Sequence, residues 1–313
     1  MLRADKIYKV RFVFMELVKK IDIHVHTVSS RGIPRPYNGN TFCLPEELIA
    51  MYDTLGIEKG VISPIIKVEQ SLEVNTNREI RDIVEKYPDR FDWFCGVDPR
   101  QGDNAPTTDF SYILNYYKSV GAKGVGEILA NMYFDDPRVW NLFKHAEACN
   151  MSVTFHIGAD NGDYGLIDEF GLPRLEKTLQ QFPNLTFLAH SQRWWAHMSG
   201  DVTEAEFCGY PEGRVAPGGR VVELMRKYPN LCGDLSAGSG CNALLRDPEF
   251  AYGFIEEFQD RLFFGTDICD PVDINHIRVK LAPFLDEAVT NGKISYEAYY
   301  KVSRGNAERL LAR

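Results

Sequence analysis

Several features are scarce or missing in this chain of 313 residues, and each absence excludes a class of protein. There is no basic excess, because 35 Lys and Arg face 44 Asp and Glu, and the net charge of −9 disfavours a nucleic-acid partner. No apolar run reaches about 18 residues, so the sequence predicts no membrane-spanning helix and no membrane partner. No low-complexity stretch or charge block divides the chain, which favours one folded unit that acts on a small molecule.

Cysteine pairing motifs are also missing. The seven cysteines are scattered and none forms a CxxC pair. The N-terminal apolar patch Val10–Met15 is interrupted by Arg11 and lacks a following small-residue cleavage site, so we interpret residues 1–20 as an N-terminal extension. Together these features predict reduced thiols and a cytoplasmic location.

What the chain does contain is a regular alternation of strand-like and helix-like segments. The predicted strands are Ile21–His26, Gly60–Pro64, Asp92–Val97, Ala122–Ile128, Ser152–Ile157, Thr186–His190, Leu231–Leu235 and Leu262–Asp267. The predicted helices are Pro45–Leu55, Glu73–Tyr87, Tyr112–Ser119, Arg138–Ala148, Arg174–Phe182, Arg220–Tyr228 and Glu249–Phe258. Alternation of this kind implies parallel strands, and eight of them predict an α/β fold, a (β/α)₈ TIM barrel, over residues 21–313. An open doubly wound sheet is the alternative.

The first predicted strand carries two histidines, although the whole chain has only seven. In IDIHVH, strict alternation places Asp22, His24 and His26 on one face and the apolar residues on the other. Buried imidazoles and a carboxylate need a partner, and a divalent cation is one. Alone, the HxH pair is a weak motif.

Four other predicted strands end in side chains that bind metals. These are Glu127 in GVGEI, His156 in VTFHIG, His190 in TFLAHS and Asp267 in FFGTDI. Because barrel enzymes place their active sites at the carboxyl ends of the strands, we expect these residues to meet. The set suits zinc, with manganese, iron or cobalt as alternatives.

This arrangement resembles the amidohydrolase superfamily. The phrases FHIG, LAHS and FGTD, with the closing RGNAERLL, are similar to its amidohydrolase-2 branch, which contains hydrolases and non-oxidative decarboxylases related to aminocarboxymuconate-semialdehyde decarboxylase. The resemblance implies that His24, His26, His156 and Asp267 bind one metal. It implies that His190 either binds a second metal or holds the attacking water, and it makes a homodimer the expected assembly.

Glu127 departs from the decarboxylase-like pattern. Those members generally lack an acidic ligand on strand four, whereas in TatD-type deoxyribonucleases such a Glu bridges two metals. A carboxylated Lys123 is a further alternative for the bridge. We therefore expect one or two divalent metal ions, with Glu127 among their ligands.

The predicted reaction is hydrolysis of a small amide, lactone or ester by a metal-activated water. Asp267 is expected to accept the proton, while His190 orients the water or polarises the electrophile. The alternative is a metal-dependent decarboxylase of an aromatic or unsaturated carboxylic acid. A barrel with a vestigial site and a nuclease are disfavoured by the intact ligand set and the acidic charge.

Loops after the strands offer candidate substrate contacts. Arg31 and Arg193 are candidates for binding a substrate carboxylate or phosphate. Trp194 and Trp195 are candidates for lining the pocket of an apolar substrate. Ser236, on the predicted seventh strand, shares the lumen-facing parity and is also a candidate.

Overall fold

The computed structural model describes residues 16–160 and 162–312. Most of the predicted N-terminal extension, residues 1–15, lies outside the described residues. All paired strands run parallel, as the alternating sequence predicts. They are β1 (Lys20–Val25), β2 (Ile57–Ile62), β3 (Phe91–Trp93), β4 (Gly124–Ile128), β5 (Ser152–Gly158), β6 (Leu166–Ile167), β7 (Phe187–His190), β8 (Leu231–Asp234) and β9 (Leu262–Phe263).

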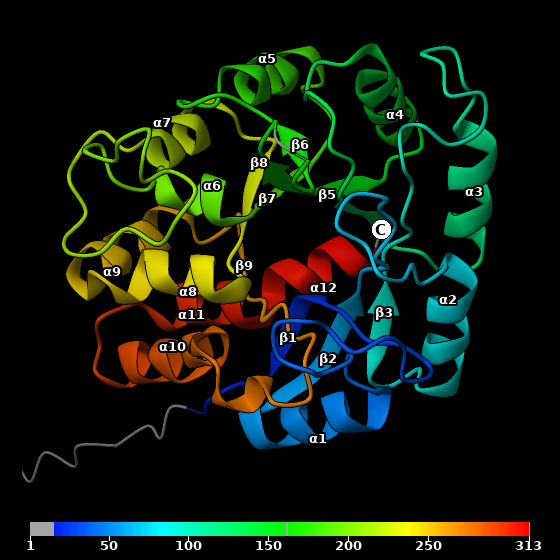
Figure 1. The fold of residues 1–313 in the computed structure, drawn as a ribbon. Helices are drawn as coiled ribbons and strands as arrows, with labels where there is room; N and C mark the ends of the chain where they lie inside the picture. The colour runs from blue at the N-terminus through cyan, green and yellow to red at the C-terminus, as the bar shows by residue number, and fades with distance from the viewer. Residues whose placement is uncertain (1–15, 161, 313) are drawn as a thin grey trace, which may run out of the picture.

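The strands form a closed barrel. Two sheets, β1-β2-β3 and β4-β5-β7-β8-β9, meet at two seams, and the short β6 pairs with β5 outside this path. At one seam the Cys95 amide donates to the Gly124 carbonyl at 2.9 Å. At the other, the Ile23 amide donates to the Phe264 carbonyl oxygen at 3.0 Å, and the Asp267 amide donates to the His24 carbonyl oxygen at 2.8 Å. Figure 1 shows the strands enclosed by helices, which confirms the TIM barrel and excludes the open sheet.

The seven predicted helices are all present. They are α1 (Pro45–Leu55), α2 (Asn77–Lys86), α3 (Ser111–Ser119), α4 (Pro137–Ala148), α5 (Pro173–Gln181), α7 (Arg220–Lys227) and α9 (Pro248–Phe258). Sequence reasoning missed short or late elements, namely α6 (Gln192–Ala196), α8 (Ala237–Leu245), η1 (Asp273–Asn275), η2 (Ile277–Lys280), α10 (Leu281–Thr290), α11 (Tyr296–Tyr300), η3 (Lys301–Gly305) and α12 (Asn306–Leu311). Among the described residues, no helix is long and apolar enough to cross a membrane.

Two hydrophobic cores hold the barrel together. The larger packs the helices against the outer faces of the strands. The smaller joins residues of five strands, with Phe94, to helix α12, and its members are Ile21, Ile23, Val61, Phe94, Leu188, Cys232, Phe263, Ala307, Leu310 and Leu311. In Figure 1, α12 lies across the ring of strands, so its apolar residues fill one end of the barrel and leave the other for polar groups.

The predicted facing of β1 is wrong at Asp22. Its carboxylate accepts hydrogen bonds from Tyr52 on α1 at 2.8 Å and from the Thr266 amide at 2.9 Å, so it points to the helix layer. The cause is a bulge, because Asp22 pairs with Gly60 but Val25 with Ile62, three residues against two. The bulge reverses the alternation, so that His24 and His26 enter the interior although Asp22 does not.

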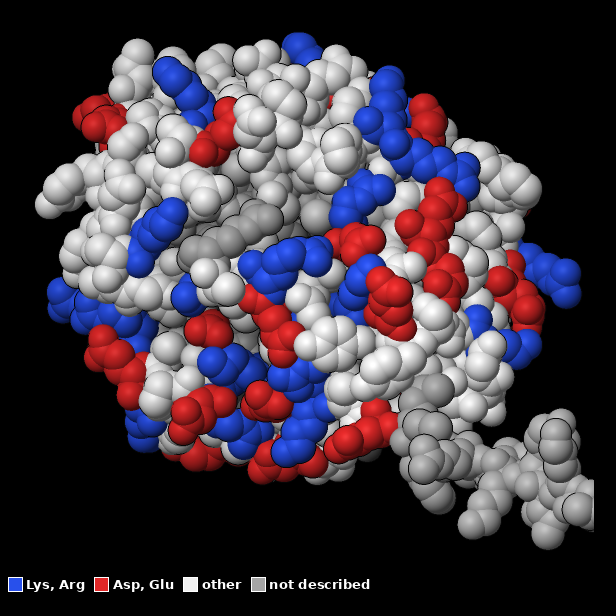
Figure 2. Space-filling model, turned by 180° about the vertical axis from the view of Figure 1, so that it is seen from behind, with Lys and Arg blue, Asp and Glu red and all other residues white. Residues whose placement is uncertain are grey.

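The surface seen from behind mixes charges of both signs. In Figure 2, acidic and basic side chains are interspersed over this face. Ion pairs join neighbouring helices, such as Arg226 with Glu257 and Lys227 with Glu176. On this face the charges therefore largely neutralise one another.

Candidate metal centre

His24 and His26 present their free nitrogens to each other. The Nδ1 of His24 bonds the Asp234 carboxylate at 2.7 Å, and the Nδ1 of His26 bonds the Ser63 carbonyl oxygen at 2.8 Å. Because both partners are acceptors, both Nδ1 atoms carry the proton. Each Nε2 then bears a lone pair, and the two Nε2 atoms lie 3.2 Å apart.

Two buried lone pairs at this separation repel each other unless a proton or a cation lies beside them. Burial disfavours the charged form of His24, but the Asp234 and Glu127 charges outweigh this and raise the pKa of His24 well above its usual value. A divalent cation would satisfy both nitrogens at once, and histidine nitrogens with carboxylate oxygens are suitable ligands. The donor set therefore fits a metal ion.

Glu127 lies between two groups of ligands. One of its oxygens is 3.5 Å from His24 Nε2, and the other bonds His156 Nδ1 at 2.9 Å. Burial opposes ionisation, but His24 and His156 outweigh it and lower the pKa of Glu127 well below its usual range. Three groups of side chains could each hold a metal ion, because the ligand atoms within each group lie within 4.8 Å of one another. These groups are His24, His26 and Asp267; Glu127, His156 and His190; and His24, His190 and Asp234. The structure thus brings together all six predicted metal ligands.

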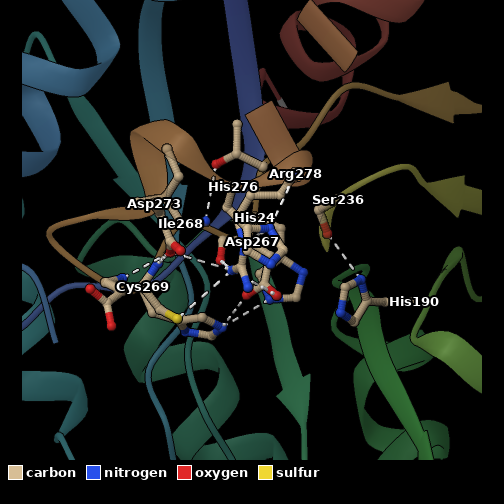
Figure 3. Close-up of polar contacts among 12 residues, drawn as sticks. His24, His190, Ser236, Asp267, Ile268, Cys269, Asp273, His276 and Arg278 are labelled. Carbon is tan, nitrogen blue, oxygen red and sulfur yellow. Dashed lines mark hydrogen bonds and ion pairs between the residues drawn. The ribbon is translucent and has the colours of Figure 1, made fainter. Parts of the chain in front are cut away.

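His190 is held by two residues at the end of the neighbouring strand β8. Its Nδ1 lies 2.9 Å from the Ser236 hydroxyl and 3.6 Å from Asp234. Figure 3 shows Ser236 directed at His190. Burial and then the neighbouring His24 charge lower the pKa of His190 to about 4. This imidazole is therefore uncharged near neutral pH.

Asp267 is enclosed by the segment that follows β9. Its Oδ1 lies 3.3 Å from His26 Nε2, and its Oδ2 lies 3.5 Å from Arg278 on η2. Figure 3 shows Arg278 and Cys269 beside it. Burial opposes ionisation, but Arg278 and His26 outweigh it and lower the pKa of Asp267 below its usual range. Its φ of +55° is uncommon for a residue with a side chain, and such conformations concentrate at functional sites.

The predicted substrate contacts are placed differently. Trp194 and Trp195 are core residues, and Trp195 donates from its ring nitrogen to the Asp234 carbonyl, so neither forms a pocket wall. Ser236 is fully buried against His190. Arg31 is half exposed and pairs with Glu47, while Arg193 lies 4.6 Å from the Phe207 ring. The structure does not bring these five residues together around the metal centre as one pocket.

Sequence reasoning gave Asp234 no role in holding the metal ligands, although that carboxylate orients His24. The available signal was its parity with Ser236, two residues further along the chain. No sequence pattern pointed to Arg278, because it lies eleven residues after Asp267 and reaches it only through the fold of η1 and η2.

Comparison with known proteins identifies the family of this chain. Residues 21–313 match the family model described as amidohydrolase, of the amidohydrolase-2 type. The chain belongs to the amidohydrolase-2 family. A search of curated proteins found no match for this amidohydrolase-2 protein.

Solved structures of similar fold cover nearly the whole of this amidohydrolase-2 chain. An uncharacterised TIM-barrel protein from Bordetella bronchiseptica has 18% identity and a TM-score of 0.61, covering 94% of this chain and 99% of its own. A putative 2-pyrone-4,6-dicarboxylic acid hydrolase from Pseudomonas putida has 16% identity and a TM-score of 0.61, covering 94% and 98%. A 5-carboxyvanillate decarboxylase from Sphingomonas paucimobilis has 15% identity and a TM-score of 0.58, covering 94% and 99%. At these identities the likeness establishes the fold.

Proposed function

We propose that this protein is a metal-dependent hydrolase of a small amide, lactone or ester, with one or two divalent cations, zinc favoured, held by His24, His26, Glu127, His156 and Asp267. The observation that carries the proposal is the position of His190, whose Nε2 lies 3.8 Å from Glu127 at the edge of this ligand set. A bound divalent cation would supply Lewis acidity, which makes water a better nucleophile and a carbonyl a better electrophile.

His190 is suited to accept the proton of the attacking water. Asp234 lies 3.6 Å from its Nδ1, which favours a proton on that nitrogen, donated toward the Ser236 hydroxyl. Its Nε2 is then a free acceptor facing the ligand cluster. Asp267 is held ionised beside Arg278, which suits it to bind a cation more than to store a proton. We therefore assign the proton to His190, and Asp267 to the metal.

The alternative reaction, non-oxidative decarboxylation, uses the same ligands but needs a proton donor for the carbon that loses CO₂. With the proton of His190 on Nδ1, its Nε2 has none to give to that carbon. The fold does not separate the two reactions, because both a pyrone dicarboxylate hydrolase and a carboxyvanillate decarboxylase resemble it. What favours hydrolysis is the geometry of His190, whose Nδ1 lies beside the Ser236 hydroxyl and whose Nε2 faces the ligand cluster.

The test is to incubate the zinc-loaded protein with lactones including 2-pyrone-4,6-dicarboxylate, simple amides and esters, and 5-carboxyvanillate. Acid release is followed by titration at constant pH, and CO₂ by mass spectrometry. We expect acid release without CO₂, and its loss in His190→Asn at unchanged zinc content. CO₂ release without hydrolysis would overturn the proposal in favour of the decarboxylase.

A further inference from the structure

A cavity lies between two helices on the outer wall of the barrel, outside the metal centre. Figure 1 shows α2 and α3 next to each other outside β3, and the Arg81 guanidinium on α2 donates to the Tyr116 hydroxyl on α3 at 3.4 Å. The cavity has a volume of about 210 Å³, and its lining includes Arg78, Arg81, Trp93, Tyr116 and Tyr117. None of the five proposed metal ligands lines it. The proposed function therefore leaves this cavity without a role.

The inner side of the cavity presents an unused hydrogen-bond donor. Trp93, at the end of β3, is only 2% exposed, and its ring packs edge-on against Tyr117 with 6.0 Å between the ring centroids. Among the described residues its ring nitrogen Nε1 has no hydrogen-bond partner, although a buried indole usually finds one. Nε1 is not fully enclosed either, and a Cβ at Gly121 would lie 3.7 Å from it, so the missing side chain leaves it uncovered. The indole N–H can therefore donate to a ligand in the cavity.

Two arginines bring positive charge to the cavity. Arg78 is exposed and, in the part of the chain that the structure describes, forms no ion pair or hydrogen bond. Arg81 lies 3.3 Å from Glu85 through Nε and 3.7 Å from Asp82 through Nη2, yet its Nε is buried and makes no hydrogen bond in the described chain. Both carboxylates thus pair with Arg81, and the charge of Arg78 stays uncompensated.

The remaining large side chains of the lining are aromatic. The rings of Tyr116 and Tyr117 have centroids 5.5 Å apart at an angle of 61°, and Trp93 continues this group inward. Such rings pack well against another ring, while guanidinium groups bind the two oxygens of a carboxylate. Pockets for drug-sized ligands have volumes of about 300 to 1,000 Å³, so this smaller cavity limits the ligand to a single ring with a small charged group.

We propose that the cavity between α2 and α3 is a second ligand site, which binds a single-ring aromatic carboxylate. Arg78 and Arg81 supply the positive charge, Trp93 Nε1 donates to a carboxylate oxygen, and Tyr117 packs against the ring of the ligand. Because the ligand binds only the folded chain, it also raises the midpoint of thermal unfolding. The site needs no metal and does not rest on the proposed function.

The test uses benzoate as the probe and follows the indole N–H signals of isotope-labelled protein by NMR, with and without zinc. We expect benzoate to shift the Trp93 signal in a saturable manner and with the same affinity in the zinc-loaded and the metal-free protein. Benzamide, which has the ring without the charge, should bind 10-fold or more weakly. Trp93→Phe assigns the signal. If this variant fails to fold, nuclear Overhauser contacts with Tyr117 assign it in the wild type.

The double variant Arg78→Met, Arg81→Met should weaken benzoate binding 10-fold or more with its circular dichroism unchanged. Arg226→Met is the matched control, because Arg226 is an exposed arginine of α7 that pairs with Glu257, and it should bind benzoate like the wild type. A Trp93 signal that does not move, that moves only with zinc, or that moves equally in the double variant would overturn the site. Inorganic phosphate binding as tightly as benzoate would overturn the aromatic carboxylate as its ligand. Zinc content is measured separately, so a failure of the proposed metal centre is not mistaken for a failure of this site.

Discussion

Replacing Asp234 by Asn tests the metal centre while keeping all five residues that we propose as metal ligands. Asp234 is completely buried and accepts from His24 Nδ1 at 2.7 Å and from the Ser236 amide at 3.0 Å. Asn keeps the size and one acceptor oxygen but removes the charge. The imidazole of His24 should then be oriented less firmly, and its Nε2 should be a weaker ligand, because the carboxylate that increases its basicity is gone.

The expected cost follows from the geometry. A charge-assisted hydrogen bond becomes a neutral one of about half the strength, at a fully buried site. Loss of a partner of this kind typically lowers metal affinity about 10-fold to 100-fold. At 25 °C this corresponds to about 1.4 to 2.8 kcal/mol. The number of metal ions bound at saturation should not change, because Asp234 acts by orienting His24 and the five proposed ligands remain.

The assay is competition for zinc between the protein and a chromophoric chelator. Asp168→Asn is the control, because Asp168 is also a buried carboxylate but accepts from the backbone amides of Glu169, Arg174 and Leu175 near the start of α5 and from none of the proposed metal ligands. We expect the control to match the wild type. A zinc affinity of Asp234→Asn within twofold of the wild type, with the fold intact by circular dichroism, would refute the role given to Asp234.

Three further predictions follow from single contacts. Glu127→Gln should reduce the zinc bound per chain, by elemental analysis, from two to one if Glu127 bridges two ions, whereas a value of one in both proteins would refute bridging. Ser236→Ala should lower kcat and leave KM nearly unchanged, because the Ser236 hydroxyl contacts His190. A change in KM alone would instead support the predicted contact between Ser236 and the substrate. Burial opposes ionisation of Glu176, but Lys227, Arg220 and Tyr228 outweigh it and lower its pKa to about 2. Its contribution to the free energy of unfolding, about 2 kcal/mol, should be present above pH 4.5 and lost as the pH falls toward 2, so Glu176→Gln should destabilise the protein near neutral pH in urea titrations but not at pH 2. In contrast, Glu46→Gln should have little effect at any pH, because Glu46 is mostly exposed.

The clustering of these side chains was predictable because strand ends are local features of the sequence. An apolar run that stops at His156, His190 or Asp267 marks both a strand and the end at which barrel enzymes place their chemistry. The residues that support these ligands were not predictable in the same way. Ser63 orients His26 through its backbone carbonyl, which leaves no trace in side-chain chemistry.

The wrong prediction for Asp22 shows the limit of arguing from alternation along a single strand. Regular alternation predicts that Asp22, His24 and His26 all point to the same face of the strand. In β1 the bulge between Asp22 and Val25 breaks this relation, and Asp22 instead joins β1 to Tyr52 and Thr266 in the outer layer. Ile23 is thereby left in the apolar core beside α12 while the next residue, His24, faces the metal centre. The bulge therefore sets the boundary between the apolar floor of the barrel and its polar end, and it does so within the strand that supplies two of the ligands.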